Sequence, residues 1–258
     1  MSREMLKLEN LSVTFGGLKA VDKVSFSVFK NEVLSLIGPN GAGKTTTFNA
    51  IIGSVNKSGG RIFFNGHDIS KTKPFHAAGL GLTKTFQNTC LFPDLTVFDN
   101  IRTGCHLREN PSLLGALFNT KAHRDQEKNT TRQAEEILEF IQLSEFAKIS
   151  AGNMPYGKQR LLKVGIAMAC NPKMLLLDEP AAGLNETETQ GMMALINRTR
   201  DLGMTVMLVE HDMKMVMGIS DRIVVLNFGR KVAEGRPEEI KTDPEVIAAY
   251  LGGQNDDA

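Results

Sequence analysis

A run of residues near the start of the chain has the types and spacing of a phosphate-binding loop. Residues 38–45 read Gly-Pro-Asn-Gly-Ala-Gly-Lys-Thr and match the pattern G-x-x-x-x-G-K-[S/T]. The glycines let backbone N–H groups turn toward phosphate oxygens, Lys44 adds a positive charge for the β- and γ-phosphates, and Thr45 offers a hydroxyl ligand to Mg²⁺. The residues predicted to bind a nucleotide are Gly38, Pro39, Asn40, Gly41, Ala42, Gly43, Lys44, Thr45 and Thr46.

The neighbouring residues place this loop between a strand and a helix. Residues 33–37 form a short apolar run, which is typical of a buried parallel strand, and residues 46–52 can continue as a helix. Phosphate binding by such a loop depends on this setting, because the N-terminus of the helix adds its own N–H groups. The flanking residues therefore favour a nucleotide-binding loop over a chance glycine-rich turn.

A pair of carboxylates follows a second apolar run, at residues 174–177. Asp178 and Glu179 end this predicted strand. An Asp-Glu pair at a strand end is more often part of a surface loop, but in P-loop ATPases one such carboxylate holds Mg²⁺ and a second can deprotonate the attacking water. Combined with residues 38–45, the pattern favours Asp178 as a metal ligand and Glu179 as the general base.

The elements that must position these residues indicate an α/β fold. Near-alternating apolar positions at 6–13 and 24–28 predict strands, and residues 61–66 predict a further strand that ends in an Asn-Gly hairpin turn. Continuous apolar runs at 174–177 and 205–209 are typical of buried parallel strands. We therefore predict an N-terminal antiparallel β-subdomain and a parallel-sheet core.

The middle of the chain has a different pattern. Apolar residues recur at helical spacing between residues 97 and 170, which predicts an inserted helical subdomain at about 89–165. Residues 119–131 are polar and predict either a loop or a solvated helix. The pattern does not distinguish a helical packing layer from a module that docks a partner. We expect one domain over residues 1–258, with a C-terminal tail at about 236–258.

Composition excludes several classes of protein. The chain has 258 residues, 41% of them hydrophobic, and a formal net charge of +1, so we expect no nucleic-acid partner. Its 3 cysteines have no metal-type spacing, which favours reduced thiols. No apolar segment is long enough to span a bilayer, so we expect any membrane association to go through a partner.

A set of motifs, taken together in order, resembles the ATP-binding subunit of an ABC transporter. The motifs are residues 38–45, Gln87 in Thr85-Phe86-Gln87-Asn88, Tyr156-Gly157-Lys158-Gln159-Arg160, Leu177-Asp178-Glu179-Pro180, Ala182-Gly183-Leu184-Asn185 and Glu210-His211-Asp212. Residues 153–160, 179–185, 209–213 and 249–252 look most like the ATPases of branched-chain amino acid importers. The resemblance covers the whole chain and implies a P-loop NTPase fold with a RecA-like parallel-sheet core.

The resemblance also implies roles for single residues. Phe15 falls where the family stacks an aromatic ring on adenine, although it could equally be a core residue at a strand edge. Gln87 would sense Mg²⁺ and the attacking water, and His211 would contact the γ-phosphate. With Lys44 and Glu179, Gln87 and His211 make up the expected catalytic set, while Thr45, Gln87 and Asp178 are the expected metal ligands.

One motif departs from the family pattern. The family's ATP lies between two chains arranged head to tail, so Pro155, Tyr156 and Gly157 would face the nucleotide held by a second ATPase subunit. Pro155 stands where the family usually has a serine and can donate neither an O–H nor an N–H. It also suits the start of a helix. Asn185 replaces the family's usual aspartate, which leaves open how strongly this chain supports its partner's site.

The function implied by the resemblance is ATP hydrolysis that powers amino-acid import. It implies ATP and Mg²⁺ as cofactors. The expected partners are transmembrane permease subunits docked near residues 87–98, a second ATPase subunit in a homo- or heterodimer and, indirectly, a substrate-binding protein. The expected location is peripheral, at the cytoplasmic face of the cell membrane. An ATPase of lipid or polysaccharide export shares the core motifs. A soluble ABC ATPase of DNA repair or translation is disfavoured, because the sequence has no coiled-coil insertion, second ATPase half or basic face.

Overall fold

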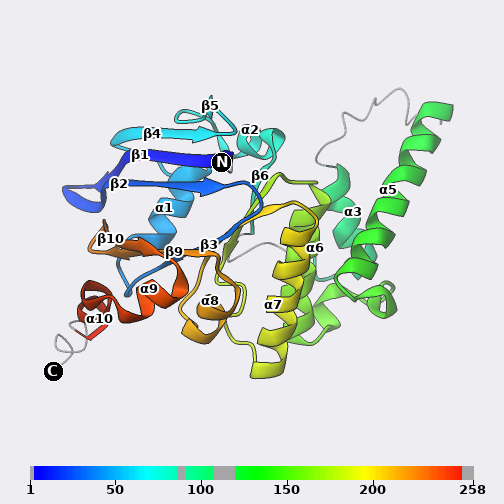
Figure 1. Ribbon diagram of the computed structural model, residues 1–258. Helices are drawn as coiled ribbons and strands as arrows, with labels where there is room; N and C mark the ends of the chain where they lie inside the picture. The colour runs from blue at the N-terminus through cyan, green and yellow to red at the C-terminus, as the bar shows by residue number, and fades with distance from the viewer. Residues whose placement is uncertain (1–2, 86–90, 107–119, 252–258) are drawn as a thin grey trace. The chain divides into compact units, whose positions relative to one another are not determined.

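The computed structural model describes residues 3–85, 91–106 and 120–251 and divides into two units (Figure 1). The first unit comprises Met1–Lys84 and Lys173–Ala258, and the second comprises Thr85–Pro172. Gln87 and Cys90 lie outside the described residues. Each unit is described by itself.

An antiparallel sheet begins the first unit. Its strands β1 (Glu4–Phe15), β2 (Leu18–Phe29), β4 (Gly59–Phe64) and β5 (His67–Asp68) lie in the order β2-β1-β4-β5. Asn65 and Gly66 connect β4 to β5 with φ angles of +49° and +82°. Two successive positive φ angles are what a tight hairpin turn of the I′ type requires, so the Asn-Gly prediction is confirmed.

The second sheet of this unit supplies the parallel core. Its strands are β3 (Val33–Ile37), β6 (Leu82–Thr85), β7 (Met174–Asp178), β8 (Thr205–Val209), β9 (Arg222–Asn227) and β10 (Arg230–Gly235), in the order β10-β9-β3-β8-β7-β6. Strands β9, β3, β8 and β7 are parallel, whereas β10 runs antiparallel to β9. The prediction of a mixed α/β fold is therefore confirmed.

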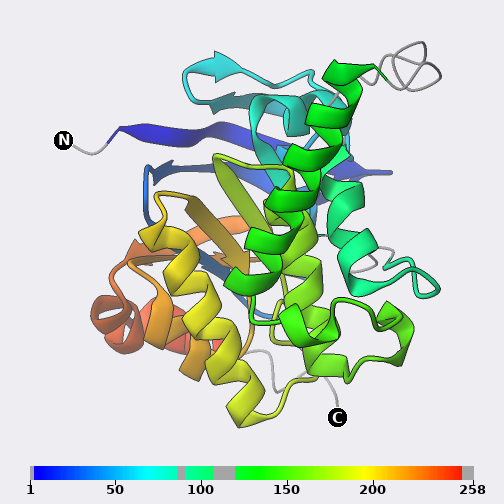
Figure 2. The ribbon, with the colours of Figure 1, turned by 90° about the vertical axis from the view of Figure 1, so that its right-hand side faces the viewer.

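Apolar side chains alternate between the two faces of this parallel sheet. Leu34 and Leu36 of β3 join a core with Phe48 of α1 (Lys44–Ile51) and the antiparallel sheet. Ile37 lies on the other face with Val216 and the C-terminal helices. Figure 1 shows α1 between the two sheets. Figures 1 and 2 show the C-terminal helices α8 (Met213–Ile219), α9 (Pro237–Thr242) and α10 (Pro244–Leu251), in orange and red, on the other side of the parallel sheet. Helices α2 (Pro74–Leu80) and α7 (Glu186–Asp201) complete the described helices of the first unit.

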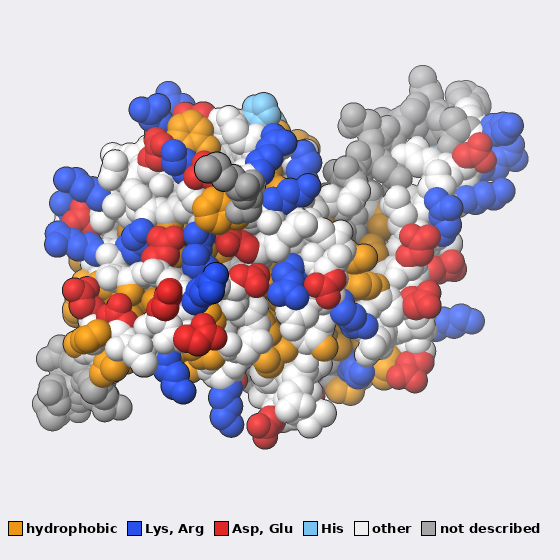
Figure 3. All heavy atoms as spheres, viewed as in Figure 1, with side chains coloured by type: hydrophobic (Ala, Val, Ile, Leu, Met, Phe, Trp, Pro, Cys, Tyr) orange, Lys and Arg blue, Asp and Glu red, His pale blue; other side chains and the backbone are white. Residues whose placement is uncertain are grey.

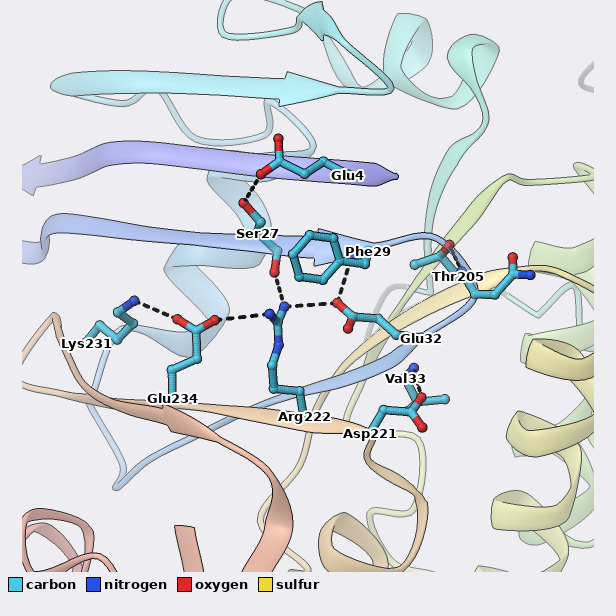
Figure 4. Close-up of polar contacts among 11 residues, drawn as sticks. Glu4, Ser27, Phe29, Glu32, Val33, Thr205, Asp221, Arg222, Lys231 and Glu234 are labelled. Carbon is cyan, nitrogen blue, oxygen red and sulfur yellow. Dashed lines mark hydrogen bonds and ion pairs between the residues drawn. The ribbon is translucent and has the colours of Figure 1, made fainter. Parts of the chain in front are cut away.

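Arg222 ties the antiparallel sheet to the parallel sheet (Figure 4). Its Nη2 donates to the Ser27 carbonyl of β2 and to Glu32 Oε1 at 3.0 Å, and its Nη1 lies 3.4 Å from Glu234 Oε1. The guanidinium also lies 4.7 Å from the centre of the Phe29 ring. One cation therefore joins β2, the β2–β3 turn, β9 and β10, and it contacts two carboxylates, of which Glu234 also pairs with Lys231 at 2.6 Å.

The second unit is helical. Helix α3 (Val97–His106) packs against α5 (Lys121–Phe140) and α6 (Tyr156–Ala169), and short 3₁₀ turns cover Ser144–Phe146 and Ala151–Asn153. Thr120 caps α5 by accepting a hydrogen bond from the His123 N–H. Residues 121–131 of the polar stretch predicted at 119–131 are therefore helix and not loop. Cys105 and Cys170 are buried, and the Cys170 thiol donates to the Gly104 carbonyl at 3.7 Å.

Charges of both signs are mixed on the face of the molecule drawn in Figure 3, where Lys and Arg side chains are interspersed with Asp and Glu side chains. Within the described ranges, none of the helices combines the length and the apolar character that a membrane crossing requires.

Candidate functional site

The predicted site residues of the first unit gather where the parallel strands end. Parallel strands bring their carboxyl ends to one edge of the sheet, and residues 38–45 follow β3, Asp178 ends β7 and His211 lies just beyond β8. The Glu179 N–H donates to the Val209 carbonyl at 2.9 Å, which joins the segment after β7 to the end of β8. The sheet order thus assembles residues that are far apart in the sequence.

Two glycines give the loop after β3 its shape. Gly38 and Gly43 have φ angles of +149° and +95°. A Cβ on Gly38 would lie 2.1 Å from the Leu226 carbonyl oxygen, and one on Gly43 would lie 2.4 Å from the Ala20 carbonyl oxygen. Real Cβ atoms do not approach backbone oxygens this closely, so only glycine fits either position.

Lys44 is the first residue of α1, and its side chain is folded onto the loop. Its Nζ donates to the carbonyl oxygens of Gly38 at 2.6 Å and Pro39 at 2.9 Å. Burial lowers the pKa of Lys44 from its ordinary value, while the charges of Glu179 and Asp178 act in the opposite direction. The ammonium therefore lies within electrostatic reach of both predicted carboxylates.

The threonines after Lys44 differ in exposure. Thr45 is exposed and Thr46 is half-buried, whereas Thr47 is buried and its Oγ1 donates to the Gly43 carbonyl at 2.9 Å. No side chain among the described residues caps the start of α1, and the first N–H groups of a helix have no intrahelical acceptor. Thr45 and these N–H groups can therefore face a ligand.

Asp178 forms a buried ion pair that the sequence analysis missed. Lys84 Nζ, at the end of β6, lies 2.9 Å from Asp178 Oδ2, and both side chains are almost fully buried. The available signal was a lysine inside the short strand at 82–85, where every residue is buried. A buried lysine requires a partner, but sequence alone does not identify that partner.

Glu179 and His211 lie together at the edge of the sheet. His211 Nδ1 is 3.6 Å from Glu179 Oε1, with side-chain exposures of 56% and 22%. Glu179 has a φ angle of +49°, which is uncommon for a residue with a side chain and is found preferentially at functional sites. The structure thus places the predicted base beside the predicted γ-phosphate contact.

Glu210 connects the segment after β7, which carries Glu179, to the segment after β8, which carries His211. The sequence pattern did not indicate this role. Glu210 is 1% exposed, and its carboxylate accepts from the N–H groups of Ala181 at 2.8 Å and His211 at 3.1 Å. Burial raises the pKa of Glu210 above its ordinary value. The available signal was an acidic residue directly after the apolar run at 205–209.

Phe15 ends β1 at the turn formed by Gly16 and Gly17, and it is 50% exposed. Stacking on a base requires an accessible ring face. The exposure of Phe15 meets this requirement, and stacking on adenine stays a prediction.

The predicted signature residues belong to the second unit. Pro155 occupies the N-cap position of α6, one residue before the helix begins, and its carbonyl accepts from the Gln159 N–H at 3.1 Å. Tyr156 is exposed and its ring lies 5.0 Å from the Arg160 guanidinium, whereas Gly157 is buried. Their approach to a second subunit stays a prediction, as does the role of Gln87, which lies outside the described residues.

Asn185 has a local structural role at the start of α7. Its side chain accepts from the Glu188 N–H at 3.0 Å, while the Glu188 carboxylate accepts from the Asn185 N–H at 3.0 Å. This reciprocal capping box satisfies two N–H groups of the first turn. Asn185 therefore serves as the cap of α7, at the position where the family usually has an aspartate.

Comparison of the sequence with known proteins gives extensive matches. The family model described as ABC transporter matches residues 21–182, and the model described as branched-chain amino acid ATP-binding cassette transporter matches residues 230–255. The chain is 46% identical to the high-affinity branched-chain amino acid transport ATP-binding protein BraF of Pseudomonas aeruginosa, over 98% of this chain and 99% of BraF. It is 42% identical to LivG of Escherichia coli, which has the same descriptive name, over the same shares.

Solved structures match the fold over nearly the whole chain. A nucleotide-free ATP-binding cassette from an ABC transporter superposes with a TM-score of 0.83 at 35% identity, covering 96% of this chain and 98% of that one. The ADP conformation of MJ1267, an ATP-binding cassette of an ABC transporter, gives a TM-score of 0.84 at 32% identity, covering 97% and 100%.

Proposed function

Because the chain belongs to the ABC transporter ATP-binding family, we propose that it is the ATPase subunit that powers import of branched-chain or related amino acids. The single observation that carries the transport part is the end-to-end similarity to BraF and LivG, including the C-terminal segment at 230–255. These relatives favour amino-acid import over the export alternative. The chain is an ATPase by family and fold.

The loop after β3 holds the phosphates in this proposal. Its backbone N–H groups and the start of α1 face the phosphate oxygens, since the glycines keep side chains out of the cradle. Lys44 Nζ leaves the carbonyls of Gly38 and Pro39 for the β- and γ-phosphate oxygens, exchanging neutral acceptors for charged ones. The exposed ring of Phe15 stacks on the adenine.

Glu179 acts as the general base. Its carboxylate accepts a proton from the attacking water, whose oxygen forms the new bond to the γ-phosphorus as the bond to the β-phosphate oxygen breaks. His211, 3.6 Å from Glu179 Oε1, contacts the γ-phosphate and holds Glu179 in place. Glu210 fixes the backbone of His211.

The residues present suit Mg²⁺, a hard cation that takes oxygen ligands and is usually bound through one or two carboxylates together with phosphates. Thr45 offers an exposed hydroxyl and Asp178 a carboxylate at the same edge of the sheet. Gln87 is the third proposed ligand. When bound, Mg²⁺ neutralises negative charge on the phosphates.

Coupling to transport requires other chains. Residues 155–157 complete the site of a second ATPase subunit, and ATP held between the two chains stabilises a closed state that hydrolysis releases. Permease subunits dock near residues 87–98, where Phe92 is 50% exposed, and a substrate-binding protein delivers the amino acid to them. The chain is thereby held at the cytoplasmic face of the membrane.

The hydrolytic role is tested by Glu179→Gln, with Glu186→Gln as the matched control because Glu186 is an exposed carboxylate on α7. Glu179→Gln retains the shape of the side chain but cannot accept a proton, so we expect normal ATP binding and turnover lower by about 10²–10⁴-fold. We also expect an ATP-bound dimer in size-exclusion chromatography. Turnover equal to that of Glu186→Gln would refute the general base.

The transport role is tested in cells. We expect deletion of this chain to abolish uptake of radiolabelled leucine, isoleucine and valine, and the wild-type chain, but not Glu179→Gln, to restore it. Uptake that is unaffected by the deletion would contradict the amino-acid assignment while leaving the ATPase assignment intact.

A further inference from the structure

Lys84 lies beside the predicted metal ligand Asp178. It comes from β6, the edge strand next to β7, and its Nζ is 2.9 Å from Asp178 Oδ2. The side-chain exposures of 4% for Lys84 and 2% for Asp178 leave almost no access to solvent. An ion pair in such a place is weakly screened by water and salt, so each charge strongly affects the other.

The same ammonium also contacts the helix that follows the phosphate loop. Lys84 Nζ donates to Asn49 Oδ1 at 2.8 Å and lies 5.8 Å from the centre of the Phe48 ring, and both residues are on α1. Lys84 therefore joins β6, β7 and α1. Helix α1 begins at Lys44, so these contacts connect the predicted metal ligand to the predicted phosphate site.

The Asp178 carboxylate is paired before any ligand binds. Lys84 Nζ lies 2.9 Å from it, and the charges of Asp178 and Glu179 both act on Lys44. A cation that approaches Asp178 meets a carboxylate whose charge Lys84 already compensates. A nucleotide without its metal ion meets a region to which Lys84 contributes positive charge.

We propose that Lys84 is a positioning residue that competes with Mg²⁺ for the Asp178 carboxylate and so sets how strongly nucleotide binding depends on the metal. The inference rests on the proposed nucleotide site and specifies the charge control of that site. Lys84 lowers the affinity for Mg²⁺ and raises the affinity for metal-free nucleotide. By linkage, both effects appear in one quantity, the ratio of the nucleotide dissociation constants without and with Mg²⁺.

The experiment measures this ratio with a fluorescent ATP analogue, in EDTA and in excess Mg²⁺. The variants are Lys84→Met, which removes the charge, Lys84→Gln, which keeps a hydrogen-bond donor, and Lys84→Arg, which keeps the charge. Lys71→Met is the control, because Lys71 is exposed. Thermal unfolding without nucleotide verifies that each variant is folded, and Lys84→Gln replaces Lys84→Met if the latter does not fold.

We expect the ratio to rise by about tenfold in the uncharged variants, because a buried charge acts at low effective dielectric. We expect Lys84→Arg and Lys71→Met to keep the wild-type ratio. A purely structural lysine would weaken binding equally in EDTA and in Mg²⁺, so an unchanged or lower ratio in Lys84→Gln overturns the proposal. Absence of nucleotide binding by the wild-type protein would instead refute the proposed function.

Discussion

Replacement of the buried Glu210 by alanine tests whether this carboxylate holds the catalytic edge together. Glu210 is 1% exposed and accepts from the N–H groups of Ala181 at 2.8 Å and His211 at 3.1 Å. An unpaired buried donor costs about 1–3 kcal/mol. Removal of a buried carboxylate offsets part of this loss, so we expect Glu210→Ala to lower the free energy of unfolding by about 2–4 kcal/mol.

The matched control is Glu188→Ala. Glu188 also accepts from a backbone N–H, that of Asn185, but at the exposed start of α7, so we expect a loss of about 0.5–1 kcal/mol. Urea unfolding monitored by circular dichroism measures both variants. Because Glu210 fixes the backbone beside Glu179 and His211, we expect ATP turnover to fall by about tenfold in Glu210→Ala alone. Equal stability and turnover in the two variants would refute the reasoning.

The pH dependence gives an independent check. Burial raises the pKa of Glu210 above its ordinary value of 4.5. The folded protein therefore binds more protons at this group than the unfolded chain does, and the contribution of Glu210 to stability falls as pH rises from 4.5 through the folded-state pKa. The difference in unfolding free energy between wild type and Glu210→Ala should shrink over this range. A difference that grows with pH would contradict the raised pKa.

Further predictions concern the phosphate loop, the link between the sheets and the signature segment. Lys44→Ala should abolish ATP binding or turnover, because it removes the point charge of the loop; unchanged ATP affinity and turnover would refute the phosphate assignment. Arg222→Met should lower the free energy of unfolding by about 2–3 kcal/mol, because it leaves the half-buried Glu32 carboxylate without its cation, while Glu234 keeps Lys231. The exposed Arg132→Met should change it by about 0.5 kcal/mol or less, and equal effects in urea unfolding would contradict this. If Pro155 weakens the site that it completes, Pro155→Ser should raise ATP turnover of the reconstituted dimer by about ten- to hundredfold. Unchanged turnover would mean that Pro155 acts only in starting α6.

The regular elements were predictable because local patterns specify them. Continuous apolar runs predicted the strands at 33–37, 174–177 and 205–209, because strands covered on both faces of a parallel sheet have no solvent side. The structure has these strands and extends the second one to Asp178. The Asn-Gly turn followed from its need for positive φ angles. Gly38 and Gly43 were identifiable from the loop pattern, although the carbonyl oxygens that exclude a side chain belong to distant strands.

Only the tertiary structure decided which charged residues meet. Lys84 reaches Asp178 because β6 lies beside β7, and Glu210 reaches Ala181 because the segment after β7 crosses the end of β8. Sequence patterns show that such residues are polar within apolar surroundings, but strand order determines their partners. A buried charge is stable only when paired, so these pairings, and the 3.6 Å approach of His211 to Glu179, depend on how the parallel strands are arranged in the sheet.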